Sequence, residues 1–218
     1  MRPVIRGIFH LLGHVEITGK ENVPTDGAYL ILFNHVSIFD PPFVAAFWKE
    51  PPEALGAEEI WQRPGQNMLA ILYGGIPIHR AGIDREALHR VIAHLRSGQP
   101  VMIAPEGTRS HAPGMGVGKQ GVVYIIEKAG VPIVPVGVAG TTDDFVQKSI
   151  KGKHPDLKMV IGEPFWLPKW EAEGVAPKFI RQWQIDQVML RIANLLPEEY
   201  RGIYADASAY TQPRQEEV

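Results

Sequence analysis

Cysteine is absent from this chain of 218 residues. Its absence excludes a disulfide framework, a zinc site built on thiolates, an iron–sulfur cluster and a cysteine nucleophile. An excess of charge of either sign is also missing, because 22 lysine and arginine residues stand against 24 aspartate and glutamate residues. The resulting net charge of −2 is a poor match for broad nucleic-acid binding, so we expect no nucleic-acid partner.

Hydrophobic runs long enough to cross a bilayer are lacking too, since no stretch approaches the roughly 20 apolar residues that a spanning helix needs. Residues 1–13 nevertheless carry an apolar side next to Arg2 and Arg6; this side consists of Val4, Ile5, Ile8, Phe9, Leu11 and Leu12. No small-residue cleavage site follows, which argues against a signal peptide. Two interpretations stay open: a helix docked on the domain, or a helix lying in a membrane interface.

The rest of the chain has the ordinary composition of a globular protein, with 45% hydrophobic and 21% charged residues. Apolar runs alternate with helical patterns along it. We predict strands at 28–33, 75–79, 101–104, 131–138 and 157–161, and helices at 41–49, 66–73, 84–97, 121–129 and 177–196. This alternation predicts a single α/β domain with a largely parallel or mixed sheet flanked by helices.

No internal repeat and no long linker divides the sequence. We expect an N-terminal amphipathic helix over 1–13, one globular domain over 14–205 and a flexible tail over 206–218, where polar residues show no periodicity.

A histidine and an aspartate follow the first predicted strand. His35 comes just after the strand, and Asp40 opens the next helix five residues later. A strand end places His35 at the carboxyl edge of the sheet, where open α/β sheets bind ligands. An aspartate that accepts from one imidazole nitrogen leaves the other nitrogen free to act as a base. The alternative is that Asp40 only caps its helix and that His35 is an ordinary loop histidine.

Three further segments stand out, and two of them carry groups that suit a phosphate. The segment Pro105–Ser110 combines a glycine, two hydroxyls and the fork of Arg109, although a turn with a solvated arginine has the same pattern. Arg80 ends a short apolar strand and could supply a second cation. The predicted strand 131–138 carries prolines, which are unusual inside a sheet and suggest an edge or a bulge.

In this order the four segments resemble the glycerolipid acyltransferase family, typified by bacterial 1-acylglycerol-3-phosphate acyltransferases. The shared motifs are Asn-His-x4-Asp at 34–40, Gly-x-x-x-x-Arg at 75–80, Glu-Gly-Thr-Arg-Ser at 106–110 and Val-Pro-Ile-Val-Pro-Val at 131–136. Pro77, Ile78 and His79 depart from the second motif, where family members often carry an aromatic residue or valine. This departure leaves Arg80 intact and affects only the expected shape of the pocket.

The resemblance implies a role for each motif residue. His35 would be the general base and Asp40 its partner. The phosphate of the acceptor would be bound by Arg80, Glu106, Gly107 and Arg109, with Thr108 carrying a weaker claim. Supporting positions around these residues would be Asn34, Ser37 and Ser110.

The resemblance also implies an activity: transfer of a fatty acyl group from a thioester to the hydroxyl of 1-acylglycerol 3-phosphate, giving phosphatidate. The donor would be acyl-CoA or an acyl carrier protein thioester, with no metal or other cofactor. We expect a peripheral protein at the cytoplasmic side of an anionic membrane. The family leaves another phosphate-bearing or lysolipid acceptor open, and a lipid-binding protein without enzymatic activity or a thioester hydrolase remain rival functions.

Two basic features remain open. Lys119 could reach a phosphate or the pantetheine arm of a donor, although a solvated lysine has the same appearance. A cluster formed by Lys148, Lys151, Lys153, His154 and Lys158 could touch anionic lipid or an acidic acyl carrier protein, or could be a solvated loop. Gly116–Gly121 fits a dinucleotide-binding motif, but its preceding strand ends about a dozen residues too early.

Overall fold

The computed structural model describes residues 2–57, 75–78, 84–170 and 173–213. The predicted helix over 66–73 and the predicted phosphate ligand Arg80 lie outside the described residues. The helices are α1 (Arg2–Leu12), α2 (Asp40–Phe47), α5 (Arg85–Arg96), α6 (Gly121–Ala129), α7 (Phe145–Ile150) and α8 (Pro177–Ala193). The strands are β1 (His14–Thr18), β2 (Leu30–Phe33), β3 (Glu53–Ala57), β4 (Gly75–Ile78), β5 (Val101–Ile103), β6 (Ile133–Ala139) and β7 (Asp156–Ile161).

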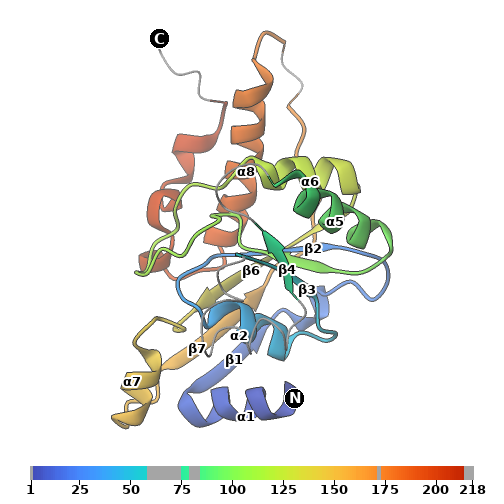
Figure 1. The fold of residues 1–218 in the computed structure, drawn as a ribbon. Helices are drawn as coiled ribbons and strands as arrows, with labels where there is room; N and C mark the ends of the chain where they lie inside the picture. Colours follow the sequence, from blue (N-terminus) through green and yellow to red (C-terminus); the bar gives the residue numbers. More distant parts are fainter. Residues whose placement is uncertain (1, 58–74, 79–83, 171–172, 214–218) are drawn as a thin grey trace.

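Within the described residues, seven strands form one sheet in the order β1-β7-β6-β2-β5-β3-β4. The paired strands run parallel, apart from the antiparallel pair β6–β7. Helices α5, α6 and α8 cover one face of the sheet, and α1, α2 and α7 cover the other (Figure 1). The predicted α/β domain with a largely parallel, mixed sheet is confirmed.

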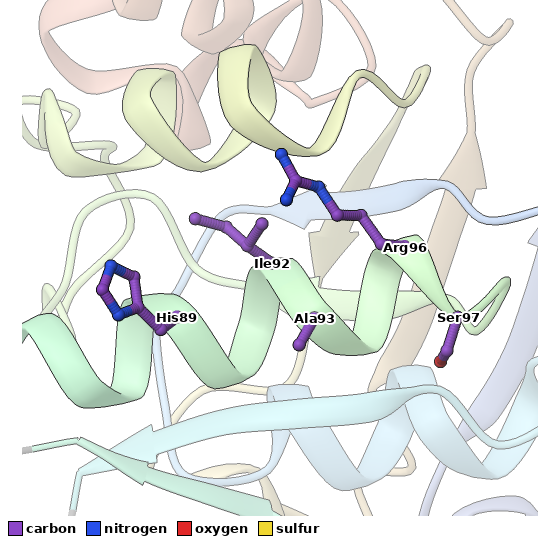
Figure 2. A pocket seen from close by; sticks show the side chains of 5 residues that line it. All are labelled: His89, Ile92, Ala93, Arg96 and Ser97. Carbon is purple, nitrogen blue, oxygen red and sulfur yellow. The ribbon is translucent and has the colours of Figure 1, made fainter.

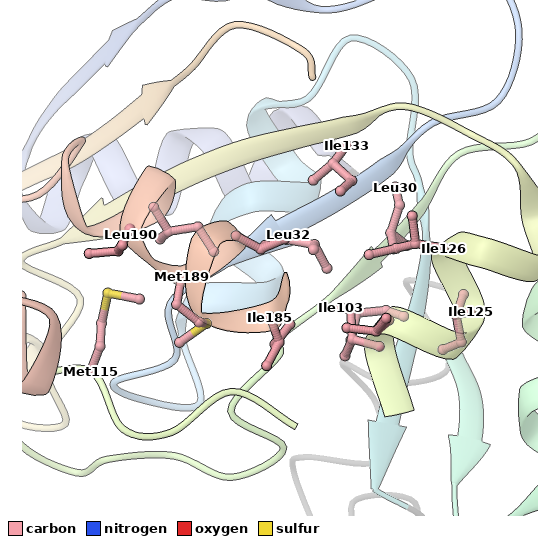
Figure 3. Packing of buried hydrophobic residues seen from close by; sticks show 14 of the residues in the cluster. Leu30, Leu32, Ile103, Met115, Ile125, Ile126, Ile133, Ile185, Met189 and Leu190 are labelled. Carbon is pink, nitrogen blue, oxygen red and sulfur yellow. The ribbon is translucent and has the colours of Figure 1, made fainter. Parts of the chain in front are cut away.

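Strand β2 shows why the sheet is apolar on both faces. Its four residues are all buried, and alternate side chains point to opposite faces. Leu30 and Leu32 pack with α6 and α8 (Figure 3), whereas Ile31 and Phe33 pack with the aromatic side chains under α1, α2 and α7. A continuous apolar run is therefore what a central parallel strand requires.

Pro135 lies in the central strand β6, so the predicted edge position is wrong for it, and the predicted bulge explains how the strand accommodates it. Ile133 pairs with Phe165 and Val136 pairs with Ile161, so the partner segment holds one more residue than β6 between these two pairs. This extra residue is a bulge. It faces Pro135, which has no N–H to donate and whose carbonyl oxygen still accepts from the Gly162 nitrogen at 2.9 Å.

Helix α1 is docked on the domain by one side. Phe9 is buried and packs edge-on against Phe43 of α2, with ring centroids 5.0 Å apart. Arg2 and Arg6, which would suit lipid headgroups by sequence, instead donate hydrogen bonds to carbonyl oxygens at the end of α2. Arg6 Nε reaches the Ala46 oxygen at 2.6 Å, and Arg2 donates to the oxygens of Trp48 and Lys49.

The other apolar side of α1 stays exposed. Val4, Ile8 and Leu11 are 65%, 48% and 73% exposed. Their spacing of four and three residues makes them one stripe along the helix. One side of α1 is therefore docked on the domain, and the opposite side remains available for a membrane interface. Among the described residues, no helix combines the length and the apolar character that crossing a membrane requires.

The described part of the C-terminal segment contains regular structure. Within the range 206–218, for which we expect a flexible tail, Ala207–Tyr210 forms a short 3-10 helix that packs on α8. Gln187 Nε2 donates to the Tyr210 oxygen at 2.7 Å, and the rings of Tyr204 and Tyr210 lie 4.9 Å apart.

Candidate active site

The site begins where β2 ends at the carboxyl edge of the sheet. The buried side chain of Asn34 bridges to the neighbouring strand β6, where its amide donates to the Val138 oxygen and its carbonyl accepts from the Val138 nitrogen, both at 2.8 Å. This pair of bonds ties the two strand ends together, although Asn34 continues no ladder. The next residue, His35, is consequently held in a defined position above the edge.

His35 and Asp40 form the pair that the motif predicts. His35 Nδ1 lies 2.9 Å from Asp40 Oδ2, and the histidine side chain is 12% exposed while the aspartate is fully buried. The same carboxylate oxygen accepts from the backbone nitrogens of Val36 and Ser37 at 2.7 and 2.8 Å. Because a carboxylate oxygen can only accept hydrogen bonds, the contact between Asp40 Oδ2 and His35 Nδ1 requires the proton on Nδ1. The free lone pair is thus on Nε2, the arrangement that a general base needs.

Thr141 completes the surroundings of Asp40 and was not found by sequence reasoning. Its hydroxyl donates to Asp40 Oδ1, and its carbonyl oxygen accepts from the hydroxyl of Ser37. Thr141 lies just after β6 and is buried. A lone threonine in a Gly-Thr-Thr turn has no pattern that links it to a residue a hundred positions earlier, so only the fold brings the two together.

Glu106 supports the backbone of His35. Its Oε1 accepts from the backbone nitrogen of His35 at 3.0 Å, and its Oε2 accepts from the backbone nitrogen of Gly116 at 2.8 Å. The side chain is 4% exposed. Burial raises the pKa of the Glu106 carboxyl, and the two N–H donors act against this rise. Both carboxylate oxygens of Glu106 thus link His35 to the 105–116 loop, and the phosphate contact expected of Glu106 stays a prediction.

Gly107, Thr108 and Arg109 occupy a turn that is attached to His35 at both ends. Glu106 holds the His35 nitrogen before the turn, and the Ser110 nitrogen donates to the His35 oxygen at 2.9 Å after it. Gly107 has φ +70°, a left-handed conformation that favours glycine. Thr108 is exposed and Arg109 half-buried, and neither side chain has a hydrogen bond or ion pair within the described part of the chain. These groups are free to meet a ligand.

Lys119 adds a cation that the sequence left ambiguous. Its stem lies along the turn, with Cγ 3.3 Å and Cε 3.8 Å from the position that a Cβ on Gly107 would take. Its backbone nitrogen donates to the Pro105 oxygen at 2.8 Å, which fixes the start of the side chain beside the motif. The ammonium therefore lies close to the same turn as Arg109.

Other candidate sites contribute nothing to this arrangement. An open hollow of about 520 Å³ on α5 is lined by His89, Ile92, Ala93, Arg96 and Ser97, none of which belongs to the motifs (Figure 2). Among the described residues, no three His, Asp or Glu side chains gather in a way that could hold a metal ion.

Comparisons with known proteins identify relatives of this chain. The profile of the family described as Acyltransferase matches residues 14–139, more than half of the chain. A 1-acyl-sn-glycerol-3-phosphate acyltransferase of Borreliella burgdorferi is 30% identical over 69% of this chain and 61% of its own, and one of Pseudomonas aeruginosa is 29% identical over 77% and 63%. The chain thus spans about three fifths of the length of these two bacterial relatives.

A solved structure shares the fold. The crystal structure of the 1-acyl-sn-glycerophosphate (LPA) acyltransferase PlsC from Thermotoga maritima superposes with a TM-score of 0.64 at 26% identity, covering 86% of this chain and 74% of that one. The resemblance predicted from the four motifs is confirmed, and the chain belongs to the acyltransferase family.

Proposed function

We propose that the protein transfers a fatty acyl group from an acyl thioester to the free hydroxyl of 1-acylglycerol 3-phosphate and so produces phosphatidate. The observation that carries this proposal is the His35–Asp40 pair, which leaves Nε2 free. Backbone hydrogen bonds attach His35 to a turn that offers an arginine and a hydroxyl, with the stem of Lys119 alongside. The names of the two bacterial relatives and of the Thermotoga maritima structure support the acceptor.

The proposed reaction is a direct attack in a complex of both substrates. His35 Nε2 removes the proton of the acceptor hydroxyl while its oxygen bonds to the thioester carbonyl carbon. The tetrahedral intermediate then collapses, the C–S bond breaks, and the imidazolium returns its proton to the departing sulfur. Asp40 stabilises the imidazolium throughout, because its buried carboxylate lies 2.9 Å from Nδ1. No cysteine exists to form an acyl-enzyme, and this route uses no metal or redox cofactor.

The acceptor phosphate would bind at the turn 107–109, which is attached to His35 at both of its ends. We assign it to the guanidinium of Arg109, the hydroxyl of Thr108 and the backbone of Gly107, and we retain Arg80 from the motif. Lys119 is added because its stem lies on Gly107. Glu106 is assigned to positioning His35, since a buried carboxylate with both oxygens occupied would repel a phosphate. Asn34, Ser37 and Ser110 keep supporting roles.

We propose that the protein acts as a peripheral protein on the cytoplasmic face of a membrane. The acceptor carries an acyl chain, and Val4, Ile8 and Leu11 form an exposed apolar stripe on α1. Such a stripe can lie at the boundary between headgroups and acyl chains. The arginines of α1 are engaged with α2, so the attraction of this helix to the bilayer would be mainly apolar.

Purified protein tests the proposal when it is incubated with acyl-CoA or acyl carrier protein thioester and a panel of acceptors, with products identified by mass spectrometry. Phosphatidate formed from 1-acylglycerol 3-phosphate is expected. Acylation of another lysolipid alone would correct the acceptor. Free fatty acid without an acylated product would indicate a hydrolase, and no turnover with a lipid bound would support the lipid-binding rival.

A further inference from the structure

We propose that α7 and the turn after it, residues 145–154, form a second membrane contact that acts together with α1 on an anionic bilayer surface. The inference rests on the proposed function only for the direction in which a lipid acceptor would enter. The binding itself follows from the position, exposure and charge of the residues.

The first step is that α7 and α1 form one surface. The hydroxyl of Ser149 donates to the carbonyl oxygen of Leu12, at the C-terminal end of α1. The rings of Phe145 and Phe9 are stacked with centroids 6.1 Å apart. Both helices lie at the same end of the molecule, at the bottom of Figure 1. A bilayer that reaches the end of α1 therefore also reaches α7.

The second step is that the outer side of this surface carries uncovered apolar side chains. Ile150, the last residue of α7, is 79% exposed. Leu11, which precedes the Leu12 carbonyl that Ser149 contacts, is 73% exposed. A large aliphatic side chain gains about 1.5–3 kcal/mol when it is fully transferred from water to an apolar environment. Two such side chains on adjoining elements are suited to insertion below the headgroups.

The third step concerns charge. Lys151 and Lys153 lie one and three residues after Ile150, both are exposed, and neither forms an ion pair with any described residue. The structure separates them from the other lysines of the predicted cluster. Lys148 is paired with Asp144 at 2.9 Å, and Lys158 is paired with Glu16 at 3.3 Å. Two unpaired lysines beside an exposed isoleucine match an anionic interface, where cations meet headgroups and apolar side chains meet acyl chains.

The fourth step links this surface to the site. Phe39, just before Asp40, packs edge-on against Phe145 of α7 with ring centroids 4.7 Å apart. The segment that leads from β6 into α7 contains Thr141, which donates to Asp40. A bilayer resting on α1 and α7 would thus adjoin the edge of the sheet that carries His35. The combination of apolar anchors and proximity to the site favours a membrane over an acidic carrier protein.

Sedimentation of the full chain with acceptor-free vesicles tests the inference. The vesicles are pure phosphatidylcholine or phosphatidylcholine with phosphatidylglycerol. Removing the two lysines in Lys151→Gln/Lys153→Gln is expected to weaken binding to the anionic vesicles about 25-fold, at about fivefold for each lysine. Ile150→Ser is expected to weaken binding to both kinds of vesicle by about tenfold. The matched controls Lys169→Gln and Ile203→Ser change exposed residues of the same types elsewhere, and they should bind like the wild type.

Wild-type binding by both the lysine and the isoleucine variants would overturn the inference. So would unchanged vesicle binding combined with a selective loss of turnover with acyl carrier protein thioester, because the patch would then bind the carrier protein. The vesicles contain no acceptor, so a wild-type protein that binds them but transfers no acyl group would refute the proposed function and leave this inference intact.

Discussion

Replacing Asp40 by asparagine separates the charge of this side chain from its hydrogen bonds. Asp40 Oδ2 accepts from His35 Nδ1, Val36 N and Ser37 N, and Asp40 Oδ1 accepts from Thr141. The three N–H donors can only face an oxygen, so the asparagine carbonyl must take the place of Oδ2. The new amide nitrogen then faces the Thr141 hydroxyl, which can rotate to accept. Asp40→Asn should therefore keep all four bonds and the same imidazole tautomer.

The expected loss is consequently that of the charge alone. A hydrogen bond to a charged group contributes about 1.5–3 kcal/mol and a neutral one about 0.5–1.5 kcal/mol, a difference of about 1–1.5 kcal/mol. At about 1.4 kcal/mol for each factor of ten, kcat should fall about 5- to 12-fold, because the imidazolium loses its partner charge. Asp40→Ala is the contrasting variant. It leaves the buried nitrogens of Val36 and Ser37 without an acceptor, at about 1–3 kcal/mol each, so its melting temperature should fall clearly.

The assay is steady-state acyl transfer for both variants, with thermal unfolding followed in parallel. A loss of about 10⁴-fold in Asp40→Asn, the size expected when an amide reverses the tautomer, would show that the N–H donors do not orient the side chain. Wild-type kcat in Asp40→Asn would show that the carboxylate charge has no part in the reaction. Equal destabilisation by Asn and Ala would contradict the four hydrogen bonds described above.

Glu106→Gln should lower kcat about tenfold, because the new amide NH2 group must face one of the two backbone N–H groups, of His35 or Gly116, that now donate to the carboxylate. The KM for the donor should stay unchanged. Burial raises the pKa of Glu106 in the folded protein above the ordinary value of 4.5. The free energy of unfolding should therefore fall as pH rises from the ordinary pKa through the raised one, and chemical denaturation should show that the Gln variant lacks this slope. Lys119→Ala should raise the acceptor KM about tenfold and leave the donor KM unchanged, and an equal rise in both would contradict its assignment. Gly107→Ala should lower the free energy of unfolding by about 1–2 kcal/mol, because Gly107 has φ +70° and an added Cβ would meet the Lys119 side chain. The same variant should raise the KM for the acceptor.

The fold was predictable wherever one element buries a long or continuous apolar pattern. The strand at Leu30–Phe33 and the helices Arg85–Arg96 and Pro177–Ala193 follow from such patterns. Two strands gave too weak a signal. His14–Thr18 lies at the end of the sheet and is partly exposed along its length, and Glu53–Ala57 contains glycine and alanine, which have low strand propensity. The helix at Phe145–Ile150 has only six residues, too few for a clear period.

The site was predictable in its motifs and less so in its contacts. His35 and Asp40 are five residues apart, so their pairing is local and readable from the chain. Glu106 has the same sequence pattern whether it faces a ligand or the backbone of His35, because the two uses differ only in burial. Arg6 likewise has an amphipathic pattern that fits a membrane, but its partner is the end of a helix forty residues away. Such choices depend on tertiary packing, which no short pattern records.

The measurement that tests the central claim most directly is acyl transfer to 1-acylglycerol 3-phosphate by His35→Ala. The variant keeps the backbone bonds of His35 to Glu106 and Ser110, so its melting temperature should stay close to that of the wild type. As a matched control, His89→Ala removes an exposed histidine of α5 and should retain full activity. The account predicts a fall in kcat of about 10²–10⁴-fold for His35→Ala. Wild-type turnover by the folded variant would contradict it.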